Sequence, residues 1–168
     1  MITALISINK PHTDNIFSKI KGLEWRGKAL PEGLYYVYET KNKGGCGKVI
    51  GEMRIVGSKA VDTNRPLEVC LVNAGCVHPV VLKKYANNGV IYANFIREAK
   101  RYEEPKTLDN FHRPCPYKLP DGTRMDVPCP CDKYTHNFDE ESGMIYCTRR
   151  IERPPQSWCR VEALKDGK

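Results

Sequence analysis

Two long segments with the composition of β-strands constrain the fold of this chain more than any other feature. They are "VIGEMRIVGSKAVD" (Val49–Asp62) and "VIYANFIREAKRYEEP" (Val90–Pro105). Both are far longer than an average strand of about five or six residues. Strands of this length bend, and Gly51 and Gly57 are the expected bend points in the first of them. A sheet built around two such strands is expected to curl.

Shorter segments supply the rest of the predicted sheet and its helices. The expected strands are Ile2–Ile8, Leu23–Arg26, Leu34–Thr40 and a closing strand within Ser157–Ala163, and short helices are expected after Lys10 and over Val80–Ala86. Runs of strands broken by two short helices indicate an α+β fold. The sequence therefore predicts a mostly antiparallel sheet, curled into a β-barrel and flanked by short helices.

The chain divides into three parts by composition. The barrel is expected over residues 1–112, a cysteine-rich insertion over 113–150, and a closing strand with a C-terminal tail over 151–168. Residues 115–148 are rich in Pro, Cys, Gly and Asp and show little periodicity, which indicates irregular structure. With 40% hydrophobic and 28% charged residues among 168, the whole has the balance of a folded domain rather than a disordered chain.

The apolar runs and the charge limit the partners. No apolar run approaches the length that spans a membrane, and the first residues lack the plan of a signal peptide, so a soluble cytoplasmic protein is expected. The net charge is +7, and residues 1–60 hold ten Lys and Arg against five Asp and Glu. This excess permits binding to nucleic acid or another polyanion, and it is equally compatible with a merely soluble basic surface.

The stretch "KGLEWR" combines a dry face with a charged one. Leu23 and Trp25 alternate with Glu24 and Arg26, so the first pair is expected to face the core and the second pair the opposite side. Lys21 has the wrong parity for the charged face.

A bend at Gly22 would let Lys21 join Glu24 and Arg26 at the mouth of the sheet. The two cations could then hold a phosphate or a carbonyl group, and Glu24 could accept a hydrogen bond from an exocyclic amine. The alternative is an ordinary solvated ion pair, which would contribute only about 0–1 kcal/mol.

Two further segments could contact a nucleic acid. "KNKGGCGK" carries Lys41, Lys43 and Lys48, which could follow a phosphate backbone, or could decorate a flexible, solvated hairpin tip. In "PPQSW", Gln156 could read a base edge and Trp158 could stack on a base. The alternative for Trp158 is to fill the core.

Four cysteines in the insertion suit a structural zinc site. Cys115, Cys129, Cys131 and Cys147 lie in a segment with too little apolar content to fold alone, and His112 and His136 are substitute ligands. The chain offers a C-x-C pair rather than the usual C-x₂-C of zinc knuckles. Reduced cysteines that bind no metal, a disulfide and a redox role remain alternatives.

The hexapeptide Lys21–Arg26 resembles the K-x-x-E-x-R signature of the ASCH domain, a branch of the PUA-like superfamily. "VIGEMRIV" and the C-terminal "RPPQSWCRVE" also resemble strands of small bacterial and prophage ASCH proteins, some of which carry a cysteine-rich insertion. The resemblance covers residues 1–112 and 153–164. It implies a module that binds RNA or a modified nucleobase, with Lys21, Glu24, Arg26, Gln156 and Trp158 as ligand contacts.

The resemblance also implies an alternative, a hydrolase acting on RNA or on N4-acylated cytidines. The subgroup that hydrolyses N4-acylcytidines carries K-x-x-T, and Glu24 stands where that threonine nucleophile is required. A metal-dependent ribonuclease has been proposed for some relatives, with Glu24 as a general base or metal ligand. Lys21 and Glu24 are therefore the candidate catalytic residues, and whether the protein is an enzyme remains open at this point.

Overall fold

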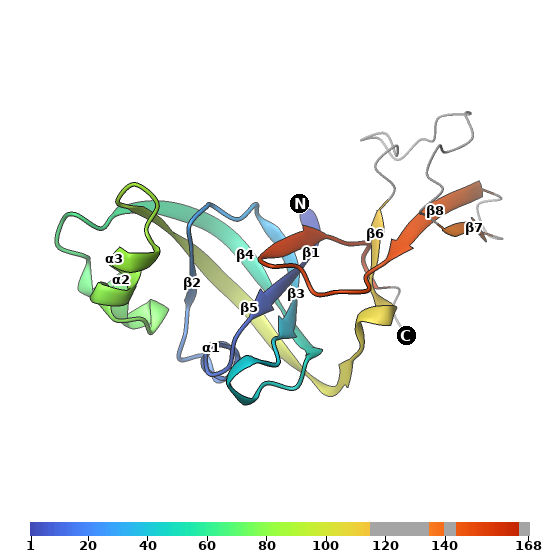
Figure 1. Ribbon diagram of the computed structural model, residues 1–168, viewed down its shortest axis with the longest axis horizontal. Coiled ribbons are helices and arrows are strands. Elements are labelled where there is room, and N and C mark those ends of the chain that lie inside the picture. Colours follow the sequence, from blue (N-terminus) through green and yellow to red (C-terminus); the bar gives the residue numbers. More distant parts are fainter. Residues whose placement is uncertain (115–134, 140–143, 165–168) are drawn as a thin grey trace.

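The computed structural model describes residues 1–114, 135–139 and 144–164 (Figure 1). Its strands are β1 (Ile2–Ile8), β2 (Leu23–Arg26), β3 (Gly33–Glu39), β4 (Lys48–Asp62), β5 (Val90–Lys106), β6 (His112–Pro114), β7 (Thr135–Asp139), β8 (Met144–Arg150) and β9 (Trp158–Arg160). Its helices are α1 (His12–Phe17), α2 (Val69–Gly75) and α3 (Pro79–Tyr85), with short 3₁₀ turns η1 (Asn42–Gly44) and η2 (Leu108–Asn110). None of the helices in these ranges has the length and apolarity needed to cross a membrane.

The main sheet has six strands in the order β2-β5-β4-β3-β1-β9. Strand β1 runs parallel to β3, and the other neighbouring pairs are antiparallel. This confirms the predicted α+β class. The backbone ladder ends at β2 and at β9, so the sheet is open and closure into a barrel is not shown.

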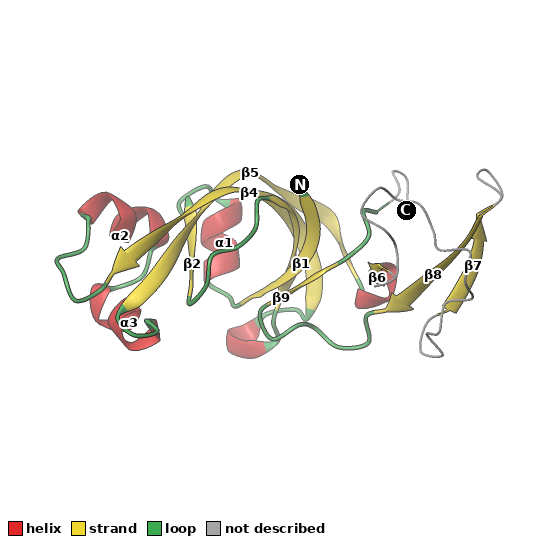
Figure 2. Ribbon diagram, turned by 90° about the horizontal axis from the view of Figure 1, so that it is seen from above, coloured by secondary structure: helices red, strands yellow, loops and turns green. Residues whose placement is uncertain are grey.

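The two long strands are confirmed as β4 and β5, and they form the longest ladder of the sheet. Their pairing shifts register at three places, and the predicted bend points Gly51 and Gly57 lie within two of these shifts. Each shift increases the local twist, as a β-bulge does. In Figure 2 the two strands accordingly arch over the rest of the domain.

Three apolar clusters hold the domain together. One lies beneath β1, β3 and β4, with Ile6, Val37 and Met53 fully buried, and a second packs Phe111 against Tyr36. The third docks α2 and α3 against β2 through its buried members Leu23, Trp25, Val61, Leu71, Leu82, Ile91 and Ala93. This third cluster places the two helices beside one edge of the sheet.

Helix α2 is an element that the sequence did not predict. It has seven residues, it has no side-chain N-cap, and only Leu71 and Gly75 are buried. So short a helix carries too few apolar positions for a helical period to stand out. Its stability comes from packing against β2.

A second sheet, with the order β6-β8-β7, lies at the opposite end of the molecule from α2 and α3 (Figure 1). Strands β7 and β8 pair antiparallel over five residues each, so the expectation of irregular structure is wrong for this part of the insertion. Phe, Ile, Tyr and Thr in these segments favour strands once a partner is present. The proposed domain boundaries stay a prediction.

Candidate functional site

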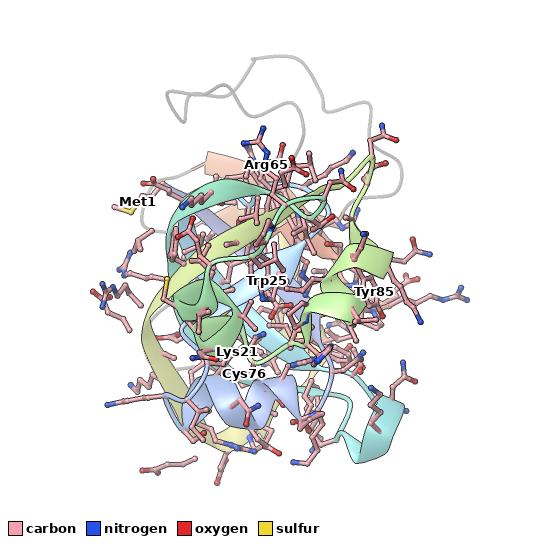
Figure 3. All side chains as sticks on the ribbon, turned by 90° about the vertical axis from the view of Figure 1, so that its left-hand side faces the viewer. Met1, Lys21, Trp25, Arg65, Cys76 and Tyr85 are labelled. Atoms are coloured by element: carbon pink, nitrogen blue, oxygen red, sulfur yellow. The ribbon has the colours of Figure 1, made fainter. Side chains whose placement is uncertain are left out.

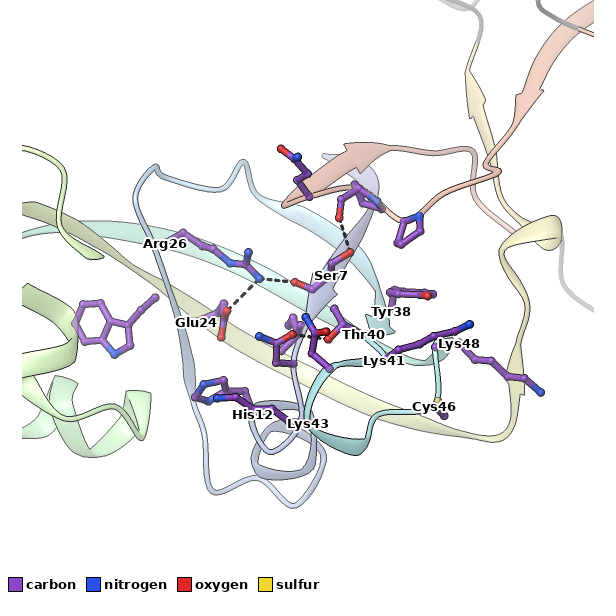
Figure 4. Close-up of a pocket in the computed structure, with 18 of the residues that line it drawn as sticks. Ser7, His12, Glu24, Arg26, Tyr38, Thr40, Lys41, Lys43, Cys46 and Lys48 are labelled. Atoms are coloured by element: carbon purple, nitrogen blue, oxygen red, sulfur yellow. Dashed lines mark hydrogen bonds and ion pairs between the residues drawn. The ribbon is translucent and has the colours of Figure 1, made fainter. Parts of the chain in front are cut away.

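A cavity of about 1230 Å³ lies where a barrel would close, between the edge strand β2 and strand β1 (Figure 4). Its wall includes Ser7 and Ile8 of β1 and Glu24, Trp25 and Arg26 of β2. Helix α1, the loop between β3 and β4, helix α3 and the C-terminal segment before β9 complete the lining. The split in the sheet therefore gives the cavity its position.

Lys21, Glu24 and Arg26 meet in this cavity; parity predicted that Glu24 and Arg26 share a face, and Lys21 joins them although its parity is different. Glu24 Oε2 lies 3.4 Å from Lys21 Nζ, and Glu24 Oε1 lies 3.1 Å from Arg26 Nη2. The three side chains are 1%, 9% and 19% exposed for Lys21, Glu24 and Arg26 respectively. Because the three side chains are largely buried, they do not form the solvated ion pair that was the alternative. Each carboxylate oxygen of Glu24 contacts a different cation.

Lys21 also holds the end of helix α2. Its ammonium donates to the Gly75 carbonyl at 2.5 Å, and the next backbone N–H, that of Gly22, donates to the Ala74 carbonyl at 2.8 Å. A cation at a helix C-terminus satisfies carbonyls that have no partner within the helix and offsets their partial negative charge. Since an ammonium has three N–H groups and two contacts are already made, Lys21 retains little capacity for a ligand.

The expected bend at Gly22 is not what brings Lys21 to Glu24. Gly22 has no left-handed φ, and a methyl group there would meet no other atom within 4 Å. The chain turns earlier, at Lys19, which has a φ of 62°. Lys21 reaches the carboxylate because α2 holds its ammonium in place.

Arg26 ties the open edge of the sheet to strand β1 and the C-terminal segment. Its Nη2 donates to the Ser7 carbonyl at 2.8 Å. The hydroxyl of Ser7 donates in turn to the Pro155 carbonyl at 2.6 Å, and its backbone N–H donates to Ser157 at 2.9 Å. Figure 4 shows this chain of contacts crossing the cavity. A side chain thus bridges the gap that the backbone ladder leaves.

The two C-terminal candidates are placed differently. Gln156 lines the cavity and is exposed. Trp158 packs against the first core cluster, with its ring 6.2 Å from that of Tyr35 in an edge-to-face arrangement, and does not belong to the cavity lining. Trp158 therefore has the core contacts that the sequence allowed for it, and its base-stacking role stays a prediction.

His12 lines the cavity too, and sequence reasoning missed it. Burial lowers the pKa of His12, and the nearby Lys21 ammonium lowers it further. The imidazole is therefore uncharged at neutral pH. The sequence contained a signal for this position. His12 is the first residue of helix α1, which lies between β1 and the segment that carries Lys21.

Three residues of the cavity wall each carry a buried side-chain nitrogen without a hydrogen-bond partner in the described part of the chain, namely Nδ1 of His12, Nε1 of Trp25 and Nε of Arg26. The nitrogens themselves are buried rather than exposed to the cavity. An unpaired buried donor or acceptor costs free energy, so these three atoms do not contribute to the stability of the fold.

The basic loop forms another part of the wall, through Lys41, Lys43 and Lys48. It is anchored rather than free. The buried Glu39 carboxylate accepts from the Thr13 hydroxyl at 2.7 Å and from the Cys46 backbone N–H at 2.9 Å, which joins the loop to α1. Burial alone would raise the pKa of Glu39, but these hydrogen bonds outweigh it and lower that pKa.

The predicted zinc ligands Cys115, Cys129 and Cys131 lie outside the described residues. Cys147 lies on β8, opposite His136 in the β7–β8 ladder. Within the described ranges, no group of three or more His, Cys, Asp or Glu side chains could hold a metal ion. The zinc site stays a prediction.

The chain forms an α+β domain with a curved, mixed and open sheet. Solved structures of an ASCH protein share this fold. A tyrosine-to-phenylalanine variant of the ASCH protein from Zymomonas mobilis has a TM-score of 0.52 and 18% identity, over 65% of this chain and 78% of that one. The serine-to-alanine variant gives 0.51 and 21% over 64% and 75%, and the protein without a stated substitution gives 0.51 and 19% over 64% and 74%.

No family model and no curated protein matches this sequence. The likeness to the Zymomonas structures therefore concerns the fold, and the role of the cavity has to be argued from its own residues.

Proposed function

We propose that this protein is a binding module for RNA or a modified nucleobase, with the Lys21–Glu24–Arg26 cavity as its ligand site. The observation that carries the proposal is a buried carboxylate held between two cations, beside a basic loop, in one cavity. Nucleic-acid ligands present both hydrogen-bond donors on a base and negative phosphates. The cavity offers a partner for each.

The geometry favours Glu24 as the group that reads a base. A carboxylate accepts hydrogen bonds only, and its two oxygens retain lone pairs after each has met one cation. An exocyclic amine or a ring N–H can supply the matching donor. Lys21 acts through Glu24. It holds the carboxylate in place, and its own ammonium has little capacity left to contact a ligand.

The phosphate contacts are assigned to Lys41, Lys43 and Lys48, which are exposed at the cavity wall. Lysines that neutralise phosphates release condensed counterions, and this makes binding depend on salt. Gln156, exposed on another part of the wall, can add a hydrogen bond to a base edge.

Glu24→Gln tests the proposal with the smallest change in shape. We expect this variant to bind a fluorescein-labelled ten-nucleotide RNA at least about tenfold more weakly in fluorescence anisotropy, because it removes a charged hydrogen bond of roughly 1.5–3 kcal/mol. Glu104→Gln, on the exposed end of β5, is the matched control. Equal affinity of Glu24→Gln and the unaltered protein would contradict the proposed role of the cavity.

A second candidate, an RNA hydrolase, is favoured by His12. An uncharged imidazole can take the proton of a ribose 2′-hydroxyl while the 2′-oxygen bonds to phosphorus. The bond from phosphorus to the 5′-oxygen breaks, water protonates the leaving oxygen, and the hydroxide that remains takes the proton back from the imidazolium. The product is a 2′,3′-cyclic phosphate, which a second water molecule can hydrolyse. Cleavage of the labelled RNA that His12→Ala abolishes would support this function, and an intact RNA after prolonged incubation would exclude it.

Hydrolysis of N4-acylated cytidines has no comparable support. Glu24 occupies the position of the threonine nucleophile. Two hydroxyls at the cavity wall, those of Ser7 and Thr40, donate to the Pro155 carbonyl and to Asn9 Oδ1. Both are therefore engaged with acceptors of the protein and not with a base that could activate them.

A further inference from the structure

The cavity has two walls of different chemistry. On one side stand Val77, Val81 and Tyr85, from α3 and the residues before it, and on the other stands the basic loop between β3 and β4. In Figure 4 the segment of α2 and α3 lies at the left of the cavity, and Lys41 and Lys48 lie at the right. An apolar wall facing a cationic one suits a ligand that is itself divided into flat rings and phosphates.

Tyr85 is the feature of this wall that packing does not explain. Its side chain is 73% exposed, whereas Leu82, on the same helix, is 1% exposed and holds α3 in the third core cluster. Val81, also at the cavity wall, is 40% exposed. Figure 3 labels Tyr85 and the buried Trp25 in the same view. A single exposed apolar residue is ordinary, but these two border the proposed ligand site.

The size of the cavity exceeds what one nucleoside requires. Pockets for drug-sized ligands have volumes of about 300–1,000 Å³, and this cavity measures about 1230 Å³. A single nucleoside at Glu24 would therefore leave part of the cavity unfilled. A strand of several nucleotides could extend from Glu24 to the basic loop and to Tyr85, which line the same cavity.

We infer that the cavity is a groove for a single-stranded nucleic acid several nucleotides long, with one base stacked on the ring of Tyr85. This inference rests on the proposed function and specifies its ligand class. The strand crosses the groove from α3 to the basic loop, and Glu24 reads a base between these ends. A paired base inside a duplex cannot present its face to the ring, so the partner is single-stranded.

Fluorescence anisotropy with labelled eight-nucleotide RNA, the same sequence in DNA, and the RNA duplex tests the inference. Tyr85→Ala is expected to weaken binding of the single strand about five- to a hundredfold, the range found when a stacking aromatic is truncated. Tyr85→Phe retains the ring and is expected to bind within about twofold of the unaltered protein. Lys84→Gln, the neighbouring exposed lysine outside the cavity lining, controls for loss of surface contacts on α3.

Length and strandedness provide two further readouts. The affinity of the unaltered protein is expected to rise from a mononucleotide to the eight-nucleotide strand and to fall at least tenfold for the duplex. Comparison of the RNA and DNA strands identifies whether the 2′-hydroxyl contributes. Because Tyr85 is largely exposed, Tyr85→Ala should melt at the temperature of the unaltered protein.

The outcomes separate this inference from the proposed function. If Glu24→Gln weakens binding and Tyr85→Ala does not, the groove inference fails and the nucleobase site stands. A mononucleotide that binds as tightly as the eight-nucleotide strand, or a duplex that binds as tightly as the single strand, also overturns the groove. If neither a nucleotide nor a strand binds the unaltered protein, both proposals fail.

Discussion

Lys21 serves the architecture and the site at once. The same ammonium contacts the carboxylate of Glu24 and the last carbonyl of α2, at Gly75. Its desolvation is offset by both contacts, since a buried charge without partners would be too costly to retain. Any ligand that displaces Lys21 from Glu24 therefore also disturbs the docking of α2.

Titration of Glu39 should make the free energy of unfolding depend on pH. Its folded-state pKa is lowered from 4.5, so its contribution is present above that value and is lost as the pH falls through the folded pKa. We expect Glu39→Gln to lower the free energy of unfolding by about 1–2 kcal/mol at pH 7, because charged hydrogen bonds to Thr13 and Cys46 are weakened.

Urea denaturation of both proteins at pH 7 and at pH 3.5 checks the sign. The difference between them should shrink at the lower pH, because pH 3.5 lies below the ordinary carboxylate pKa and the contribution declines from there towards the lowered folded-state pKa. Glu103→Gln, on the exposed surface of β5, should cost nothing at either pH. A difference that is the same at both values would show that Glu39 does not contribute through its charge.

At the scale of elements, the contact between α2 and β2 sets the shape of the site. Gly75 packs directly on the indole of Trp25, and a methyl group at Gly75 would overlap its Nε1. This close approach is what lets the Gly75 carbonyl reach Lys21. The absence of a side chain at Gly75 of α2 thus determines where the Lys21 ammonium lies.

Gly75→Ala should therefore be costly and Gly22→Ala should not. We expect Gly75→Ala to reduce the free energy of unfolding by about 1–3 kcal/mol, as overpacking does, and to shift the fluorescence of Trp25. Gly22→Ala should change stability by less than about 0.5 kcal/mol, since open space surrounds that position. Thermal and chemical denaturation of the two variants measure this. A large loss of unfolding free energy in Gly22→Ala would support the bend at Gly22 that the sequence suggested.

Over the whole molecule, the charge of +7 acts through its distribution. Lys41, Lys43 and Lys48 are gathered at the cavity by the anchored loop, whereas Lys83, Lys84 and Lys100 lie outside its lining. The first group is expected to hold phosphates locally, and the second contributes only to a diffuse positive field. Each group contains three lysines, so replacing either group removes the same charge. Any difference between the two variants then reflects where the lysines lie.

Replacing Lys41, Lys43 and Lys48 by Gln should reduce the salt dependence of RNA binding. Each lost phosphate contact to a single strand lowers the slope of log K against log salt by about 0.7, so a decrease of about 2 is expected. Anisotropy titrations between 50 and 200 mM salt, roughly the range over which this dependence is large, provide the measurement. The triple variant of Lys83, Lys84 and Lys100 should change the slope by less than half as much. Equal changes would mean that the loop is not the phosphate site.

By itself the sequence determined the strands of the sheet, the bends of β4, and the meeting of Glu24 with Arg26. These follow from side-chain parity and local composition, which act over a few residues. It also indicated Lys21 as the third member of the cluster, although neither the backbone conformation nor the packing at Gly22 requires a glycine there.

Only the tertiary structure decided that the sheet stays open, that the basic loop and Tyr85 border the gap, and that His12 joins them. It also decided the tie between Lys21 and Gly75, which are 54 residues apart. Contacts of this kind depend on how separate elements dock, and docking is set by the fit of buried side chains such as Trp25 and Leu82. No local pattern encodes that fit, so the strands and the charged cluster on β2 could be predicted, and the elements that line the rest of the cavity could not.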